Sequence, residues 1–512
     1  MLLTIILSPL IGSILTVWSN SKLVALLSSI ITFILSLFVW ILFDFNYAGF
    51  QFDSIFLPSY LSIGLGFQSF STIEYGIDGI GIYLILLTTI LTIIIILNGP
   101  YDKEYLFWLL FSESILVALF SILDIVYFYI LFELILIPLY FIMRRSIQIY
   151  PYRKQKIERA INKLLGYTLF GSFLMLIGLI LLYIKTGTTN YSFLISHTDW
   201  LESSSYLWLS SSILPNSNIG IDPIKLIWVL FFIAFAVKVP VLPFHVWLPE
   251  AHSEAPTGGS MLLAGIILKI GTYGIIRYLI PILPNTTLYF REIVICLFVL
   301  SLIYSSLICL RQIDLKKLIA YSSVAHMNLA LIGLFSGEYD GILGGYFLMI
   351  SHGFISVALF YCVGLLFSRY SVRSIKYYRA LSITMPIFSL IFFFFNLANI
   401  GFPLTSGFIA EVLIFLGVYK MSFIVAFIAS LSIIFSGAYA IWLTTRVLFG
   451  RPRATTLITG PINRNSLVSI SQDITRKETF ILILLVTFTI LLGIFPKFVF
   501  NGLEVPLSYL VL

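Results

Sequence analysis

Apolar runs of about 20 residues recur along almost the whole chain, with short polar segments between them. A helix of that length crosses a hydrocarbon core of about 30 Å. The runs show no alternation of apolar and polar positions, so helices are expected rather than the strands of a barrel. The pattern predicts an all-α polytopic membrane protein with about fourteen transmembrane helices.

The expected spans are 2–18, 23–43, 78–98, 105–121, 123–142, 160–184, 225–247, 257–280, 288–308, 314–335, 340–368, 384–418, 422–448 and 477–499. Two of them contain helix-breaking residues. The seventh is interrupted at Pro240 and Pro243, and the twelfth at Pro403 and Gly407. Both are therefore predicted to be discontinuous helices.

The two interrupted spans occupy corresponding places in the chain. If helices 4–8 and 9–13 are two five-helix units, the fourth helix of each is broken. An odd number of helices turns the second unit upside down, which is typical of inverted-repeat transporters with a site near the midplane. The expected domains are the N-terminal helices (1–103), a first half-channel repeat (104–285), a second inverted repeat (286–450), and a basic loop with helix 14 (451–512).

Charge supports the membrane assignment and adds an orientation. Of the 512 residues, 60% are hydrophobic and 10% charged, against about 25% charged in soluble domains. Lys and Arg cluster at 144–159, 310–317, 368–379 and 446–477, each after an odd-numbered helix. The basic loops then share the matrix or cytoplasmic side, and both termini lie opposite. Arg277 and Arg291 are a mild exception, and the net charge of +7 does not indicate nucleic-acid binding.

Cofactor and metal chemistry find little support in the sequence. The three cysteines form no CxxC pair, so neither a disulfide framework nor a zinc or iron–sulfur site is expected. There is no P-loop, GxGxxG, GxSxG or HExxH motif. The five histidines show no repeated spacing that would favour haem ligation. We expect no metal ion and no cofactor bound by this chain.

Ionisable side chains lie far inside several apolar spans. A charge at a helix centre costs about 2.5–3.5 kcal/mol on insertion scales, and such residues usually mark ion or proton pathways. Buried lysine, glutamate and histidine can exchange protons near neutral pH. The candidates for a proton path are Glu133, Lys238, Lys269, His326, His352 and Glu411, with Glu113, His245 and His252 less strongly indicated.

Structural explanations compete with this one. Glu133 and Lys238 have opposite signs and could pair across helices 5 and 7, as a purely structural ion pair would. Lys269 and Glu411 could extend to an interface. Glu113 lies near an uncertain helix boundary, and a histidine in an apolar span is often a core residue with satisfied hydrogen bonds.

The broken helices supply a second feature that a proton path requires, namely free backbone groups and helix ends inside the membrane. Pro240 and Pro243 are expected to leave the carbonyls of Ala236 and Val239 without helical donors, so that water can enter. Lys238 would then lie at the negative end of the first half-helix. In the twelfth span, Thr405 or Ser406 could cap the second half, with Glu411 about one turn later near its positive end.

Several stretches carry a family resemblance. They are "FAVKVPVLPFHVWLPEAHSEAPTGGSMLLAGIILKIGTYGIIRY", "FYILFELILIPLYFIM", "DLKKLIAYSSVAHMN", "SHGFISVALF" and "GFIAEVLI". Together they resemble the antiporter-like membrane subunits of respiratory complex I over roughly residues 100–450. Within that family, Glu411 in place of a lysine and the end at Leu512 soon after helix 14 resemble one of the three subunit types.

The resemblance implies a function. Glu133 and Lys238 would form the charged pair of one half-channel, Lys269 would link it to a central axis through His326 and His352, and Glu411 would serve the second half-channel. Redox chemistry would occur elsewhere in the complex, with NADH, FMN, iron–sulfur clusters and ubiquinone held by other subunits. The only small-molecule substrates of this chain would be protons and water.

The same resemblance implies partners and a location. The partners would be other membrane-arm subunits of complex I, including neighbouring antiporter-like chains, and the lipid bilayer. The location would be the mitochondrial inner membrane. Two other functions remain open at this point: a subunit of a cation/proton antiporter, and a mainly structural scaffold of the membrane arm.

Overall fold

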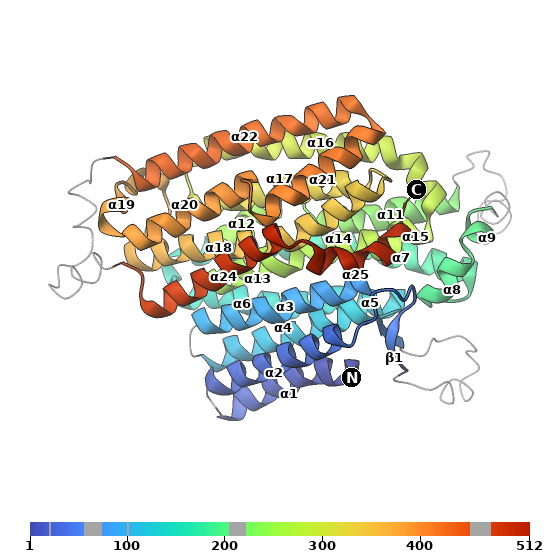
Figure 1. Cartoon of the computed structure of the whole chain (residues 1–512). Coiled ribbons are helices and arrows are strands. Elements are labelled where there is room, and N and C mark those ends of the chain that lie inside the picture. Colours follow the sequence, from blue (N-terminus) through green and yellow to red (C-terminus); the bar gives the residue numbers. More distant parts are fainter. Residues whose placement is uncertain (20–21, 56–73, 100–101, 204–221, 451–472, 512) are drawn as a thin grey trace.

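The computed structural model describes residues 1–19, 22–55, 74–99, 102–203, 222–450 and 473–511. Helices in these ranges run roughly side by side along one direction and form an elongated bundle (Figure 1). Within the same ranges, twelve helices are long and apolar enough to cross a membrane. The two interrupted elements are not among the twelve, because none of their halves is longer than 16 residues. The chain is a multi-pass membrane protein.

The N-terminal helices form one side of the bundle (Figure 1). They are α1 (Leu2–Ser19), α2 (Lys22–Ile41) and α3 (Gly79–Asn98). Between α2 and α3, β1 (Gln51–Ile55) pairs antiparallel with β2 (Glu74–Ile77). Many apolar side chains of α1 and α2 are exposed, whereas most residues of α3 are buried. The first two helices therefore lie at the periphery and α3 belongs to the core.

The next helices contain the first interruption. In chain order they are α4 (Lys103–Ser121), α5 (Ile125–Leu134), α6 (Leu136–Ile149), α7 (Lys154–Thr186), α8 (Tyr191–Ser196), α9 (Thr198–Ser203), α11 (Pro223–Lys238), α12 (Trp247–Glu254), α13 (Thr257–Leu262), η4 (Leu263–Ile267), α14 (Leu268–Gly274), η5 (Ile275–Leu279) and α15 (Ile280–Ile282). Short 3₁₀ turns, η2 (Pro151–Arg153) and η3 (Phe244–Val246), precede α7 and α12.

The remaining helices contain the second interruption. They are α16 (Pro284–Arg311), α17 (Leu315–Leu334), α18 (Tyr339–Tyr370), α19 (Leu381–Thr384), α20 (Pro386–Ile400), α21 (Ser406–Met421), α22 (Phe423–Leu448), α24 (Arg476–Ile494) and α25 (Lys497–Ser508), with the 3₁₀ turn η6 (Ile375–Tyr377) before α19. Helix α18 packs against both α17 and α21. Both termini lie towards the end of the bundle that carries α8 and α9, opposite α19 (Figure 1).

Three elements differ from the expected spans. The fifth span divides at Ile135 into α5 and α6, because Pro138 cannot donate to the carbonyl four residues earlier. Helix α7 begins at Lys154 rather than at 160, so part of the expected basic loop is helical and carries a Lys154–Glu158 pair at 3.9 Å. The eighth span contains two π-helical turns, η4 and η5. The domain boundaries and the inverted relation of the two units stay predictions.

A buried ion pair fastens the N-terminal helices to the core. Asp78 caps α3 by accepting a hydrogen bond from the Gly81 amide at 2.9 Å. The Arg277 guanidinium, in η5, binds both oxygens of the same carboxylate, with Nη1 at 2.8 Å from Oδ2. Its Nε donates to the Tyr273 hydroxyl at 3.2 Å. Arg277, the expected exception to loop charge, is therefore a buried structural residue.

We predict that Arg277→Met lowers the yield of assembled protein, because it leaves the Asp78 carboxylate buried without its cation. Loss of one partner of a buried pair costs about 3–5 kcal/mol, whereas loss of both costs much less. Native gels of the membrane complex should show less assembly for Arg277→Met than for the Asp78→Asn/Arg277→Met double variant. Lys154→Met, which breaks an exposed pair, is the control. Equal losses in the single and double variants would contradict this role.

Candidate functional site

Lys238 lies where the first interrupted helix stops, as expected. It is the last residue of α11 and is buried. The ammonium Nζ lies 4.2 Å from the centre of the Phe132 ring and 3.4 Å from the Phe132 carbonyl oxygen. These contacts hold the cation at the negative end of α11, where the helix dipole favours it.

Side chains satisfy much of the broken backbone after Lys238. The indole of Trp247 donates to the carbonyl of Val237 at 3.0 Å, and the hydroxyl of Ser301 accepts from the Leu242 amide at 3.2 Å. The expectation that the Ala236 carbonyl would be free is wrong, because the Val241 amide donates to it at 2.9 Å. The break is thus a turn whose conformation next to Lys238 is fixed by hydrogen bonds to its backbone.

Glu133 follows Phe132, the residue whose ring and carbonyl contact Lys238, but Glu133 itself does not contact Lys238. Among the ion pairs of the described residues there is none between Glu133 and Lys238. Its Oε1 is buried and has no hydrogen-bond partner within the described part of the chain. The same side chain lines a shallow hollow between α5, α6 and α7. One carboxylate thus faces both the interior and the outer surface.

Lys269 connects α14 to α18. It lies in α14 between the two π-helical turns, a feature often found at functional sites. Its Nζ donates to the Ala264 carbonyl at 2.6 Å and lies 3.0 Å from Nδ1 of His352, in α18. Helix α14 packs against α11 next to Lys238, since a Cβ built on Gly271 would be 3.1 Å from the Lys238 Cβ.

The contacts continue from His352 to Glu411. The rings of His352 and His326, in α17, are 5.9 Å apart between their centres. Nδ1 of His326 lies 3.7 Å from Oε1 of Glu411, in α21. A cavity of about 10 Å³ beside this pair is lined also by Ser306, Ser432, Ser436 and Tyr439. That is room for about one water with several polar partners.

The second interruption lies next to the Glu411 carboxylate. Residues 401–405 separate α20 from α21, and Gly407 lies one residue inside α21. The expected cap is wrong, because the Thr405 hydroxyl donates to the Phe402 carbonyl at 2.7 Å and Ser406 bonds to Ser351 at 2.9 Å. Gly401 has a φ of 83°, and a Cβ there would be 2.3 Å from Oε2 of Glu411.

The three less strongly indicated residues make other contacts than those of the row from Lys269 to Glu411. His245 packs edge-on against Tyr304, at 5.4 Å between ring centres. His252 is buried, stacks on Phe360 at 4.6 Å, and within the described residues has no hydrogen-bond partner on either ring nitrogen. Glu113, in α4, accepts a hydrogen bond of 2.7 Å from Thr32, in α2, so it contacts the N-terminal helices.

Residues in the basic loops form a cluster that the sequence does not reveal. Oε1 of Glu254, at the end of α12, lies 3.2 Å from Arg153 and 3.1 Å from Arg373. Lys316, at the start of α17, donates to the Ala255 carbonyl at 3.0 Å. Burial lowers the pKa of the Arg373 guanidinium from its ordinary value. Their positions showed only that these cations face one side of the membrane, and no local pattern indicated that they turn inward.

Within the described ranges there is no group of three or more His, Cys, Asp or Glu side chains that could bind a metal ion.

Two interrupted helices, and a row of buried Lys, His and Glu side chains between them, define a membrane subunit of the antiporter type. Comparisons with known proteins agree. Residues 123–436 match the family model described as "NADH:quinone oxidoreductase/Mrp antiporter, TM".

Similar proteins cover the whole chain. NADH-ubiquinone oxidoreductase chain 4 of Marchantia polymorpha is 42% identical over 99% of this chain and 96% of its own length, and the Arabidopsis thaliana protein of the same name is 41% identical over the same shares. A chain of respiratory complex I from Thermus thermophilus has a TM-score of 0.84 at 25% identity, with both chains fully covered. The chain belongs to the NADH-ubiquinone oxidoreductase chain 4 family of antiporter-like membrane subunits. The Mrp complex from a Dietzia species shares the fold, with a TM-score of 0.81 at 18% identity.

We predict that Gly401→Ala impairs the site through two effects. The left-handed backbone at this position costs about 1 kcal/mol or more with a side chain, and the new methyl group would displace the Glu411 carboxylate. The share of proton pumping per NADH oxidised that this chain supplies should fall several-fold in complex that still assembles.

Two glycines serve as controls for Gly401→Ala. Gly437→Ala adds a methyl group to open space on α22, and Gly450→Ala adds one at a φ of 103° with no atom within 4 Å. Both should pump normally. A loss of pumping in Gly450→Ala equal to that in Gly401→Ala would show that strain alone, and not the Glu411 contact, is responsible.

Proposed function

We propose that the chain carries protons across the mitochondrial inner membrane as a subunit of NADH:ubiquinone oxidoreductase. Oxidation of NADH and reduction of ubiquinone take place in other subunits and drive the transfer. The proposed path runs through Glu133 and Lys238, then Lys269, His352 and His326, and ends at Glu411.

The contacts from Lys269 to Glu411 are the observation that carries this proposal. An ammonium, two imidazoles and a carboxylate follow one another at 3.0, 5.9 and 3.7 Å (the middle value between ring centres). Each group can gain or lose a proton. All four are buried in helices where an ionisable group is costly, so a function other than packing accounts for their presence.

Lys238 and Glu133 form the entrance to this row in the proposal. The contact of Gly271 with Lys238 brings α11 and α14 together within the region where Lys269 lies. No direct contact joins the two lysines, so transfer between them passes through water or through movement of the long side chains. Loss of a proton from Lys238 removes the positive charge near Glu133. In the proposal, the protonation states of this pair and of Lys269 are therefore coupled.

Sidedness follows from the loop charges and the termini. We propose that the basic segments around 144–159, 310–317 and 368–379 face the matrix. The termini lie at the opposite end of the bundle from α19, and so on the opposite side in this assignment (Figure 1). The partners are other membrane-arm subunits, including neighbouring antiporter-like chains, and the surrounding lipid.

We predict that Lys269→Gln abolishes the share of proton pumping that this chain supplies, because the row loses its only lysine between Lys238 and His352. Proton uptake per NADH oxidised should fall in vesicles that contain the assembled complex. Lys163→Gln, which removes a half-exposed lysine paired with Glu250 at 2.6 Å, is the matched control.

Two outcomes would contradict the proposal. Unchanged pumping with Lys269→Gln would favour a structural role for the buried charges. Sodium-dependent transport by the chain in vesicles without its redox partners would favour a cation/proton antiporter.

A further inference from the structure

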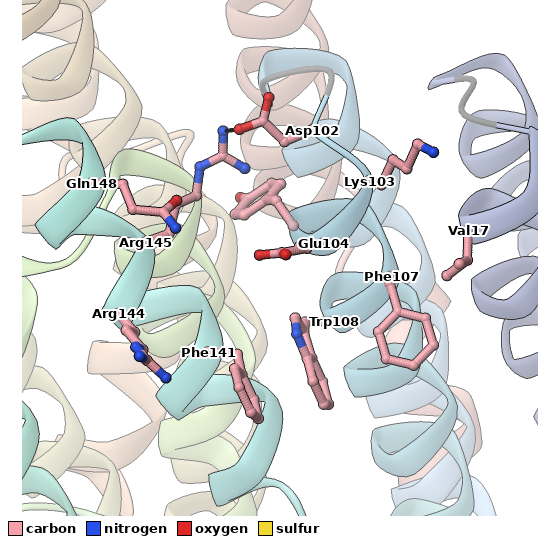
Figure 2. Close-up of a pocket in the computed structure, with 11 residues that line it drawn as sticks. Val17, Asp102, Lys103, Glu104, Phe107, Trp108, Phe141, Arg144, Arg145 and Gln148 are labelled. Carbon is pink, nitrogen blue, oxygen red and sulfur yellow. Dashed lines mark ion pairs between the residues drawn. The ribbon is translucent and has the colours of Figure 1, made fainter.

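A hollow of about 1060 Å³ lies outside the proton path, between the start of α4, the end of α6 and α1 (Figure 2). It is at the end of the bundle where the basic segment 144–159 begins. The lining side chains combine charges with large aromatic rings. They are Val17, Asp102, Lys103, Glu104, Tyr105, Phe107, Trp108, Phe141, Arg144, Arg145 and Gln148.

The aromatic side chains make one wall of the hollow. The rings of Trp108 and Phe141 stack at 4.1 Å with 3° between their planes, and Phe107 meets Trp108 edge-on at 4.9 Å. Val17 contributes from α1 on the far side (Figure 2). The nitrogen of the Trp108 indole lies on the side nearer Glu104 (Figure 2). An apolar wall with a polar edge at a membrane boundary is typical of contact with lipid.

The charged side chains are of both signs and are not all paired with one another. Arg145 forms an ion pair with Asp102 and lies over the Tyr105 ring, yet its Nε is buried and has no hydrogen-bond partner within the described part of the chain. Arg144 is exposed and extends from α6 on the same side as Phe141 (Figure 2). The exposed guanidinium of Arg144 is therefore the available donor suited to a phosphate, while Arg145 holds Asp102.

Glu104 limits which phosphate-containing molecule fits. Its carboxylate is exposed and points from α4 into the space between α4 and α6 (Figure 2). A headgroup with more than one negative charge would place an anion near this carboxylate. A headgroup that carries an ammonium beside its phosphate would satisfy Glu104 and Arg144 together.

We propose that the hollow is a binding site for a phospholipid with a zwitterionic, primary-amine headgroup, such as phosphatidylethanolamine. The phosphate accepts hydrogen bonds from the exposed guanidinium of Arg144, and the ammonium donates to Glu104. The glycerol and the start of one acyl chain lie along Trp108 and Phe141. Basic pockets between helices on this side of a membrane bind lipid headgroups in general, and the carboxylate makes this one selective.

The site has a structural consequence for the N-terminal helices. Lipid held between α1, α4 and α6 would fill the space beside the peripheral helices and fix their position against the first unit. The proposal does not depend on proton transfer through the path above, because none of its residues belongs to that path.

The test uses the assembled complex in vesicles that contain a photoactivatable phosphatidylethanolamine. Crosslinked peptides should include segments of α1, α4 and α6 that line the hollow. Unlabelled phosphatidylethanolamine should compete roughly tenfold better than phosphatidylcholine, whose trimethylated nitrogen cannot donate a hydrogen bond to Glu104. Phosphatidylglycerol should compete no better than phosphatidylcholine.

Three variants separate the contributions. Glu104→Gln should remove the preference for the primary amine while crosslinking persists, and Glu104→Lys should shift the preference to phosphatidylglycerol. Arg144→Gln should weaken crosslinking by all three lipids. Lys156→Gln, an exposed lysine of the same basic segment that does not line the hollow, is the matched control.

Three results would overturn the proposal. Equal competition by the amine and trimethylamine lipids would show non-selective contact with the bilayer. Stronger competition by phosphatidylglycerol in the unaltered complex would show an anionic-lipid site. Crosslinking that is absent because side chains of a neighbouring subunit fill the hollow would show a protein interface.

Discussion

The contact between the Lys269 ammonium and the His352 imidazole is the interaction on which the arrangement of the core depends. It joins α14 to α18 through two groups that both bind protons. In hydrocarbon neither group is tolerated without a polar partner. The Ala264 carbonyl supplies one for Lys269, and it is available within a π-helical turn. Removal of Lys269 would leave Nδ1 of His352 buried without this partner, whereas removal of His352 would leave Lys269 bonded to the Ala264 carbonyl.

The two ends of the bundle are held differently from its middle. At one end the Arg277–Asp78 pair fixes α3 to η5, and at the other Glu254 gathers Arg153 and Arg373 around the end of α12. These are guanidinium–carboxylate pairs, which hold fixed geometry and do not exchange protons near neutral pH. The middle contains lysine, histidine and single carboxylates, which can exchange protons. Rigid ends therefore enclose a centre whose charges can change.

The sequence allowed much of this to be predicted, for identifiable reasons. Prolines in otherwise apolar spans gave the break after Lys238, and charges far from helix ends gave the row from Lys269 to Glu411. The division of the fifth helix at Ile135 was missed, although Pro138 was the signal for it. The π-helical turns were missed because helices buried on all sides show no periodicity from which a local change of pitch can be read. The inward-facing arginines were missed because loop charge indicates a side of the membrane and nothing about burial.

The two π-helical turns on either side of α14 have a mechanical consequence. A π turn contains about one residue more than an α turn, so each stores a small length of surplus chain. Passing that surplus from η4 to η5 would move the seven residues of α14 by about one position, about 1.5 Å along the axis and about 100° around it. Such a step would turn the Lys269 side chain from one neighbouring helix towards another while the ends of the span stay in place. The helix that carries Lys269 is thus a short α-helical segment flanked on both sides by turns whose pitch can change.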